Sequence, residues 1–176
     1  MIKQDDFIQS IQDALQYISY YHPEDYIQAL TKAYHKEESH SAKAAMEQIL
    51  INSRMCALGK RPLCQDTGIV VVFVKIGMDV RWDFKQPIEE LVNQAVRQAY
   101  LLPDNKLRAS MVSQPAHSRV NTKDNTPAVT HVQMVAGDCI EIALAAKGGG
   151  SENKSKLVML NPSDSIVDWV VKTVPT

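Results

Sequence analysis

Cys64, Gln65 and Asp66 stand side by side in the segment RPLCQDTG, residues 61–68, just before a run of β-branched residues. A thiolate in this position could ligate an iron–sulfur cluster, and the amide and carboxylate beside it could be aimed at a substrate. The residue types also fit a buried thiol at the start of a strand, and on residue types alone this second interpretation is the more frequent one. Asp66 would then make only local turn hydrogen bonds.

Gly148, Gly149 and Gly150 form a second candidate segment, within KGGGSENKSK at residues 147–156. Backbone without side chains can approach a ligand closely, and successive N–H groups can form a nest for an anion. The spacing matches neither GxGxxG nor the P-loop, which disfavours a nucleotide-binding loop. An anion nest and a flexible exit from a strand both remain open.

A polar loop over residues 107–127 contributes further charged side chains, Arg108 among them. Arginine can clamp a carboxylate through two parallel hydrogen bonds, although a solvated surface loop explains the same charges. His131 is expected to be a hydrogen-bonded core histidine. Cys56 and Cys139 are expected to be packing residues.

Helical periodicity predicts four helices before this loop and a closing helix after it. The first helix should bury Ile8, Ile11, Leu15 and Ile18. The second, with Pro23 in its first turn, should bury Tyr26, Leu30, Ala33 and Tyr34. The third, capped by Ser41 and ending at Gly59, should bury Ala45, Ile49 and Leu50. A fourth helix is expected at Gln86–Leu102 with Pro87 in its first turn, and the closing helix should turn Ile166, Trp169 and Val170 inward.

Three apolar runs predict the strands. Ile69–Gly77 is a continuous β-branched run of the kind that is buried on both faces. Val129–Val135 and Cys139–Ala145 follow, joined at Gly137 and Asp138. The expected fold is therefore α+β, with an N-terminal helical layer packed on a small mixed β-sheet.

Length and composition set the broad class. The 176 residues suit one domain, and the net charge of -1 points to neither a nucleic-acid surface nor a membrane patch. No apolar run approaches a membrane span and the N-terminus lacks a signal-peptide pattern, so we expect a cytoplasmic chain without membrane or nucleic-acid partners. The three cysteines are an odd and sparse set, which argues against a disulfide framework. They include no CxxC pair, which argues against a zinc knuckle or a ferredoxin-type cluster within this chain.

Five blocks taken together, RPLCQDTG, LRAS, NTKDNTPA, KGGGSENKSK and LNPSDS, resemble the class I (iron–sulfur) fumarate hydratases. The alpha subunit of the two-subunit L-tartrate dehydratases shares this pattern. The blocks occur in the family's order, and the resemblance covers nearly the whole chain.

The resemblance implies a hydro-lyase that interconverts fumarate and (S)-malate through a 4Fe–4S cluster, whose open iron acts as a Lewis acid. By that resemblance Cys64 is one of three cluster ligands, and Gln65 and Asp66 lie beside the dicarboxylate, with Asp66 in a catalytic role. Arg108 would bind the substrate, and Gly148, Gly149 and Gly150 would line its pocket.

The chain also departs from the family pattern, because the other two cluster cysteines and a second catalytic domain are expected beyond residue 176. Residues 1–176 would then be the N-terminal, alpha-type domain of a larger two-domain enzyme, cut at its C-terminal end. Alone it should be inactive and without the cluster, and its partners would be the rest of the enzyme or a second subunit, in a homodimer. The alternative is a non-catalytic relative or excised module that binds a partner chain or an anion. The resemblance admits fumarate, tartrate or a methylated dicarboxylate as the substrate.

Overall fold

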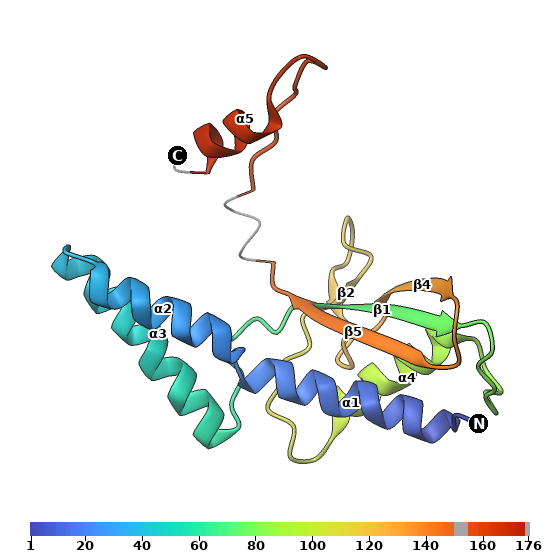
Figure 1. Ribbon diagram of the computed structural model, residues 1–176. Helices are drawn as coiled ribbons and strands as arrows, with labels where there is room; N and C mark the ends of the chain where they lie inside the picture. The colour runs from blue at the N-terminus through green and yellow to red at the C-terminus, as the bar shows by residue number, and fades with distance from the viewer. Residues whose placement is uncertain (150–154, 175–176) are drawn as a thin grey trace.

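The computed structural model describes residues 1–149 and 155–174, and it confirms the α+β class. A three-stranded sheet of order β4-β1-β5 lies over two helices, α1 and α4 (Figure 1). The bounds are α1 Gln4–Tyr20, α2 Glu24–Lys36, α3 His40–Gly59, β1 Ile69–Gly77, α4 Ile88–Leu101, β4 Val129–Val135, β5 Ile140–Lys147 and α5 Ile166–Thr173. Two-residue strands β2, Val112–Ser113, and β3, Val120–Asn121, pair within the loop that follows α4.

The core lies between the sheet and the pair α1 and α4. Each element contributes a stripe at its own period, 3.6 residues for the helices and two for the strand. The buried members are Phe7, Ile8, Ile11, Leu15 and Tyr20 of α1, Val70, Val72, Val74 and Ile76 of β1, and Leu91, Val92, Ala95, Val96, Ala99 and Tyr100 of α4. The stripe expected on the first helix is thus confirmed, with Ile18 partly buried at its end.

The sheet is mixed, as expected, and β1 is its central strand. It runs parallel to β4, with Val71 opposite Val129, and antiparallel to β5, with Ile69 opposite Lys147. The turn between β4 and β5 crosses the end of β1, where the Gly77 N–H donates to the Cys139 carbonyl at 2.9 Å. A Cβ on Gly77 would lie 2.3 Å from the Gly137 carbonyl oxygen, so the crossing requires glycine there.

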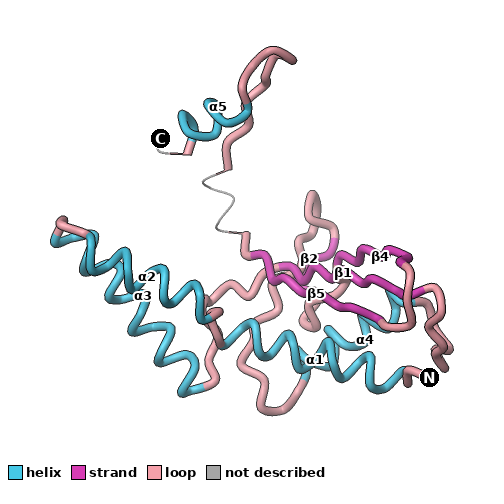
Figure 2. Tube along the Cα trace, in the orientation of Figure 1, coloured by secondary structure: helices cyan, strands magenta, loops and turns pink. Residues whose placement is uncertain are grey.

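The expectation that β1 is buried on both faces is wrong for this chain. Its even-numbered residues are buried, but Ile69 is 39% and Phe73 46% exposed on the other face. No helix of the described residues covers that face (Figure 2). The β-branched run identified the strand correctly but could not report which layers pack on it.

Helices α2 and α3 form a hairpin that extends beyond the sheet and α1 (Figure 1). No residue of α2 is buried, and α3 buries only Ser53 and Cys56, so the stripes predicted for both helices are wrong as core positions. The two helices pack mainly against each other, and Tyr26 and Ile49 are each left 41% exposed. The N-cap of α3 is also Ser39 and not Ser41, because the Ser39 Oγ accepts from the Ala42 N–H at 3.4 Å.

Both prolines expected inside the first turn of a helix, Pro23 and Pro87, are instead the N-cap residues of α2 and α4. The closing helix α5 forms as predicted, but none of its residues is buried, and Figure 1 shows it apart from the sheet. Ile166 is 70% and Val170 52% exposed, which corrects the inward placement expected for them. None of the described helices combines the length and the apolar character that a bilayer crossing requires.

Candidate functional site

The sheet topology explains why motifs far apart in the sequence meet. Because β1 and β4 are parallel and β5 is antiparallel, the segments before β1, before β4 and after β5 emerge at the same edge of the sheet. These segments hold RPLCQDTG, NTKDNTPA and the glycine block, and LRAS joins them from the end of α4.

Asp66 lies at the centre of this edge. Its Oδ1 accepts from the Gly68 N–H and from the Ser110 hydroxyl, both at 2.9 Å. Its Oδ2 accepts from the Gly149 N–H at 2.8 Å. One carboxylate therefore joins the turn before β1, the segment after α4 and the glycines after β5.

Gly68 allows the turn and the glycine block to touch. Its φ is +76°, and a Cβ would lie 2.3 Å from the carbonyl carbon and oxygen of Lys147 and 2.5 Å from the Gly148 nitrogen. Any side chain would therefore be strained and would also collide with the backbone at the end of β5.

Asn125 connects two of these segments from inside the protein. It is fully buried, its Oδ1 accepts from the N–H groups of Ser110 at 2.7 Å and Met111 at 3.1 Å, and its Nδ2 donates to the Gly68 carbonyl at 3.0 Å. The segment Arg108–Met111 is thereby held against the turn at Gly68.

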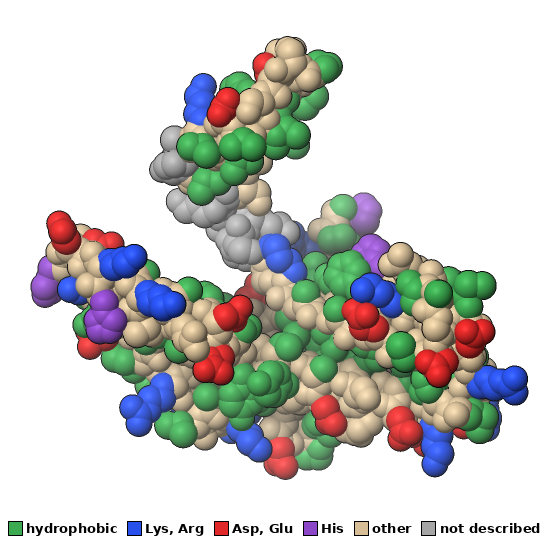
Figure 3. Space-filling model, in the orientation of Figure 1, with side chains coloured by type: hydrophobic (Ala, Val, Ile, Leu, Met, Phe, Trp, Pro, Cys, Tyr) green, Lys and Arg blue, Asp and Glu red, His purple; other side chains and the backbone are tan. Residues whose placement is uncertain are grey.

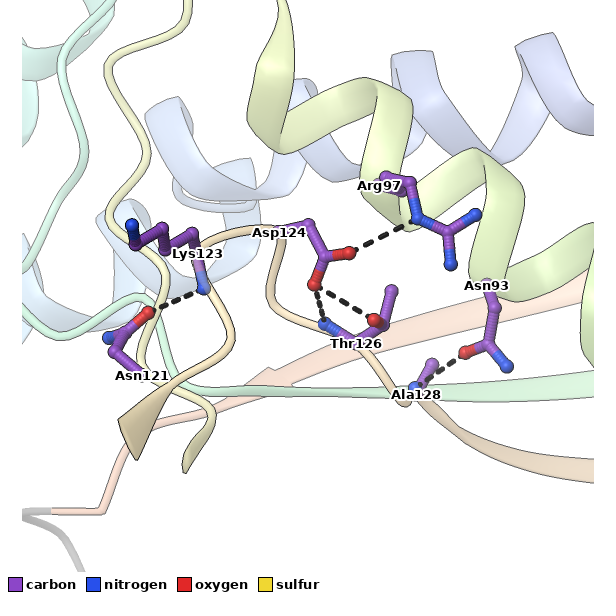
Figure 4. Close-up of polar contacts among 7 residues, drawn as sticks. All are labelled: Asn93, Arg97, Asn121, Lys123, Asp124, Thr126 and Ala128. Carbon is purple, nitrogen blue, oxygen red and sulfur yellow. Dashed lines mark hydrogen bonds and ion pairs between the residues drawn. The ribbon is translucent and has the colours of Figure 1, made fainter. Parts of the chain in front are cut away.

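The loop that carries Asn125 is anchored to α4 (Figure 4). Arg97 Nε donates to Asp124 Oδ2 at 3.1 Å, and Asp124 Oδ1 accepts from the Thr126 N–H at 3.0 Å and hydroxyl at 2.8 Å. Burial by itself raises the pKa of Asp124, but the Thr126 hydrogen bonds and the Arg97 charge outweigh it and hold the pKa below its ordinary value. The Ala128 N–H also donates to Asn93 on α4 at 2.9 Å.

A buried hydroxyl chain supports the same region. Tyr100 donates to Thr67 Oγ1 at 3.2 Å, and Thr67 donates to the Arg108 carbonyl at 2.5 Å. Desolvation by burial raises the pKa of Tyr100, the Thr67 hydrogen bond lowers it, and the nearby Asp66 charge raises it, so that the net direction is up. The phenol therefore stays protonated and can act as the donor.

Cys64 and Gln65 are exposed at the front of the site, and the Cys64 Sγ lies 3.5 Å from the Gln65 Oε1. The backbone before them is fixed, because the Leu63 N–H donates to the Ser19 carbonyl at 2.9 Å and Asn52 donates to the Leu63 carbonyl at 3.1 Å. A pocket of about 160 Å³ adjoins the sulfur. Its lining is Ile18, Ser19, Pro62, Leu63, Cys64, Asp66, Thr67 and Ala146.

The site residues expected from the sequence differ in how closely they gather. Asp66 and Gly149 are in direct contact, and a Cβ on Gly148 would lie 3.5 Å from Asp66 Oδ2. Arg108 contributes its carbonyl to the site, while its side chain is exposed. Gly150 lies outside the described residues.

Two other expectations are corrected by the structure. Cys56 is buried as expected, with its Sγ 3.4 Å from the Pro62 carbonyl, but Cys139 is exposed. His131 is not a core residue either, since it is exposed on β4 and stacks on Phe73 with ring centroids 4.9 Å apart.

The cysteines can supply one ligand at this site. Cys139 lies at the Gly77 end of β1, about 25 Å of strand away from the Cys64 end. No group of three or more Cys, His, Asp or Glu side chains suited to a metal ion occurs within residues 1–149 and 155–174. An exposed thiol beside a pocket fits one corner of an iron–sulfur cluster, but the described residues do not complete its ligand set.

Sequence reasoning gave no role in the site to Ser110 and Asn125, which hold it together with Thr67. Ser110 and Asn125 stand inside blocks that were recognised, LRAS and NTKDNTPA. Asn125 adopts a φ of +61°, which asparagine tolerates better than most residues. An asparagine within a recognised block was therefore the signal in the sequence for a special backbone position.

The family model of fumarate hydratase (fumerase) matches residues 8–176 of this chain. A candidate L(+)-tartrate dehydratase subunit alpha from Methanocaldococcus jannaschii is 36% identical over 160 residues, 88% of this chain and 55% of that protein. The anaerobic class I fumarate hydratase of Escherichia coli K12 is 36% identical over 121 residues, 69% of this chain and 22% of that enzyme. The L(+)-tartrate dehydratase subunit alpha of Escherichia coli O157:H7 is 27% identical over 157 residues.

The chain therefore belongs to the fumarate hydratase family of hydro-lyases, as its sequence blocks indicated. It spans about half the length of the tartrate dehydratase alpha subunits that it matches, and about a fifth of the fumarate hydratase.

Proposed function

We propose that residues 1–176 form the alpha-type domain of a hydro-lyase that adds water to a small unsaturated dicarboxylate, with fumarate and (S)-malate as the reacting pair. The observation that supports this most directly is the meeting of three family blocks at Asp66, through Gly68, Ser110 and Gly149. A carboxylate fixed by three donors from three segments is well ordered, as a group that must face a substrate should be.

Each residue of this edge has a role in the proposal. Cys64 provides one thiolate to a 4Fe–4S cluster, and its exposure beside a pocket suits this role. When bound, the cluster supplies an iron with an open position that acts as a Lewis acid on water or on the substrate hydroxyl. The Gln65 amide and the Arg108 guanidinium bind substrate carboxylates.

Asp66 holds or moves a proton at Oδ1 or Oδ2 while hydroxide and a proton are added to the two carbons of the double bond. The Gly148 and Gly149 backbone lets the substrate approach Asp66, because neither residue places a side chain there. Gly150 is included in this role by the family pattern alone.

The proposal includes a partner, either the rest of the enzyme chain or a second subunit, which supplies the other two thiolates and further basic residues. Two observations support it: the relatives named as alpha subunits are about twice the matched length, and this chain leaves one sheet face and α5 uncovered. A cytoplasmic homodimer of the assembled enzyme completes the proposal.

L-tartrate is the second candidate substrate, because the tartrate dehydratase alpha subunits match 88% of this chain and the fumarate hydratase 69%. The test is anaerobic iron–sulfide reconstitution of this chain, alone and co-expressed with the partner. Iron content, visible absorption, and turnover of fumarate, (S)-malate and L-tartrate are then measured.

We expect cluster absorption and turnover only in the co-expressed sample, and the preferred substrate decides between the two candidates. About four irons per chain in the isolated protein, insensitive to Cys64→Ser, would refute the ligand assignment. An assembled, iron-loaded enzyme that hydrates or dehydrates none of these acids would refute the function.

A further inference from the structure

Asn125 connects two segments of the site, although it lies 57 residues from Gly68 and 15 from Ser110 in the sequence. Its side chain is fully buried, and both ends of its amide are in use, with the oxygen accepting from Ser110 and Met111 and the nitrogen donating to Gly68. The Ser110 hydroxyl then donates to Asp66 at 2.9 Å. Asn125 is therefore one residue removed from the Asp66 carboxylate on two sides, through Ser110 and through Gly68.

The chemistry of the position calls for asparagine. An aspartate has the same shape and could accept from both N–H groups, but when ionised it could not donate to the Gly68 carbonyl. Glycine accepts the φ of +61° but has no side chain to bridge the segments. Among the common residues, asparagine combines tolerance of this φ with one donor and one acceptor at the required reach.

We propose that Asn125 is a positioning residue for the hydro-lyase site. It holds Arg108 and Ser110 in register with the turn at Asp66, so that the Arg108 guanidinium and the Asp66 carboxylate face the same substrate. This proposal rests on the proposed function. It adds that the relative placement of these two groups is set from the interior, by a residue that does not touch the substrate.

The anchoring of the loop agrees with such a role. Asp124 and Ala128, on either side of Asn125 in the sequence, are each tied to α4, by Arg97 and Asn93 (Figure 4). Because α4 belongs to the core, Asn125 is presented to the site from a rigid support.

The experiment compares Asn125→Asp and Asn125→Gly with a matched control, Asn105→Asp. Asn105 also bridges main-chain groups with both ends of its amide, through Tyr100 and Leu107, but it does not contact Asp66, Ser110 or Gly68. The glycine variant removes the bridge without straining the positive φ, so it remains informative if a buried carboxylate prevents folding.

The first measurement is amide hydrogen exchange on this chain by NMR. Each variant is compared with the wild type under conditions that give both the same free energy of unfolding. Asn125→Gly should exchange the Ser110 and Met111 amides at least about tenfold faster, because it removes their acceptor, whereas Asn105→Asp leaves them protected. Wild-type protection at these two amides in Asn125→Gly would overturn the proposal.

The second measurement is kcat and KM per folded molecule in the assembled enzyme. Both Asn125 variants should lower kcat/KM at least about tenfold, and lowering the pH should restore Asn125→Asp in part, because a protonated carboxyl can again donate to the Gly68 carbonyl. An Asn125→Gly enzyme with faster exchange but unchanged kcat/KM would overturn the positioning role. A wild-type assembly without hydro-lyase activity would overturn the proposed function instead, and the exchange result would stand independently of it.

Discussion

The Asp66 carboxylate connects separate segments of the chain through its hydrogen bonds. Its two oxygens accept from Gly68 in its own turn and from Ser110 and Gly149, which reach it only when the chain folds. Cys64, two residues earlier, is exposed and carries no packing role. Two residues of one block therefore have different tasks: Asp66 holds the site together, and Cys64 is open to a ligand.

Cys64→Ala should leave this chain folded and remove iron binding from the assembled enzyme. An exposed side chain contributes little packing, so the free energy of unfolding should change by less than about 0.5 kcal/mol. Denaturant unfolding and iron content after reconstitution are the two measurements. Cys56→Ala is the control and should cost about 1 kcal/mol because its side chain is buried, while Cys139→Ala should be neutral. Full iron loading and activity in Cys64→Ala would contradict the assignment.

Alanine at the two glycine positions beside Asp66 should affect different properties: mainly stability at Gly68 and mainly turnover at Gly149. Gly68→Ala should lower the free energy of unfolding by at least about 2 kcal/mol, because φ is +76° and the Cβ would meet the Lys147 backbone at 2.3 Å. At Gly149 φ lies outside the left-handed region, and among the described residues a Cβ would meet only Asp66 Oδ2, at 3.6 Å, so Gly149→Ala should cost less than about 1 kcal/mol.

If the proposed function holds, turnover per folded molecule should nevertheless fall about tenfold or more in Gly149→Ala, because the methyl group would occupy space that the proposal assigns to the substrate beside Asp66. Thermal unfolding and kinetics on the same samples separate the two effects. Normal turnover in Gly149→Ala would show that this backbone serves only as scaffold.

At the scale of the elements, α4 does more than complete the core. Its inner stripe packs under the sheet, while Arg97 and Asn93 on another side of the helix hold the loop that carries Asn125 (Figure 4). The helix thus links the hydrophobic core to the geometry of the site.

Asp124→Asn should lower the stability of the chain at neutral pH by about 1–2 kcal/mol, because it removes a charged acceptor from Arg97 and Thr126. The lowered native pKa of Asp124 stabilises the fold above the unfolded value near 4, and this contribution is lost as the pH falls through the native pKa. Unfolding free energies should therefore differ at pH 7 and converge below about pH 4. A difference between the unfolding free energies of wild type and Asp124→Asn that stays constant over this pH range would contradict the lowered pKa of Asp124.

The described residues leave apolar surface uncovered in several places, and two of them suit a partner. One is the outer face of the sheet, with Ile69 39%, Phe73 46% and Val129 44% exposed. The other is α5, over which hydrophobic side chains gather (Figure 3), with Val167 70% and Val171 66% exposed. Contiguous exposed apolar surface of this kind marks an interaction site, so these two surfaces suit a partner.

The isolated chain should bind a hydrophobic dye and self-associate at micromolar concentration, since exposed apolar surface of this kind favours association. Phe73→Thr with Val129→Thr keeps strand-forming residues and should reduce both effects, as should co-expression with the partner. Dye fluorescence and sedimentation velocity measure the two effects. The matched control is Lys75→Thr, which changes the same face at an ion pair with Glu141. A monodisperse monomer without dye binding would contradict this expectation.

The sequence by itself determined the local elements and the family. Apolar periodicity identified α1 and α4, and the β-branched run located β1 to the residue, because these signals depend on near neighbours in the chain. The family blocks likewise named Cys64, Gln65, Asp66 and the glycines as site candidates, since catalytic residue types can be read without coordinates.

Only the tertiary structure decided which of these residues meet. The contacts of Asp66 with Ser110 and Gly149 span 44 and 83 residues of sequence, and the bond from Asn125 to Gly68 spans 57. They arise because β1 lies between a parallel and an antiparallel neighbour, a pairing that no local pattern encodes. The errors have the same origin: the outer face of β1, the hairpin α2 and α3, and α5 all carry apolar residues that a sequence marks as buried. Burial depends on which layer packs against them, and that is a property of the folded molecule and its assembly.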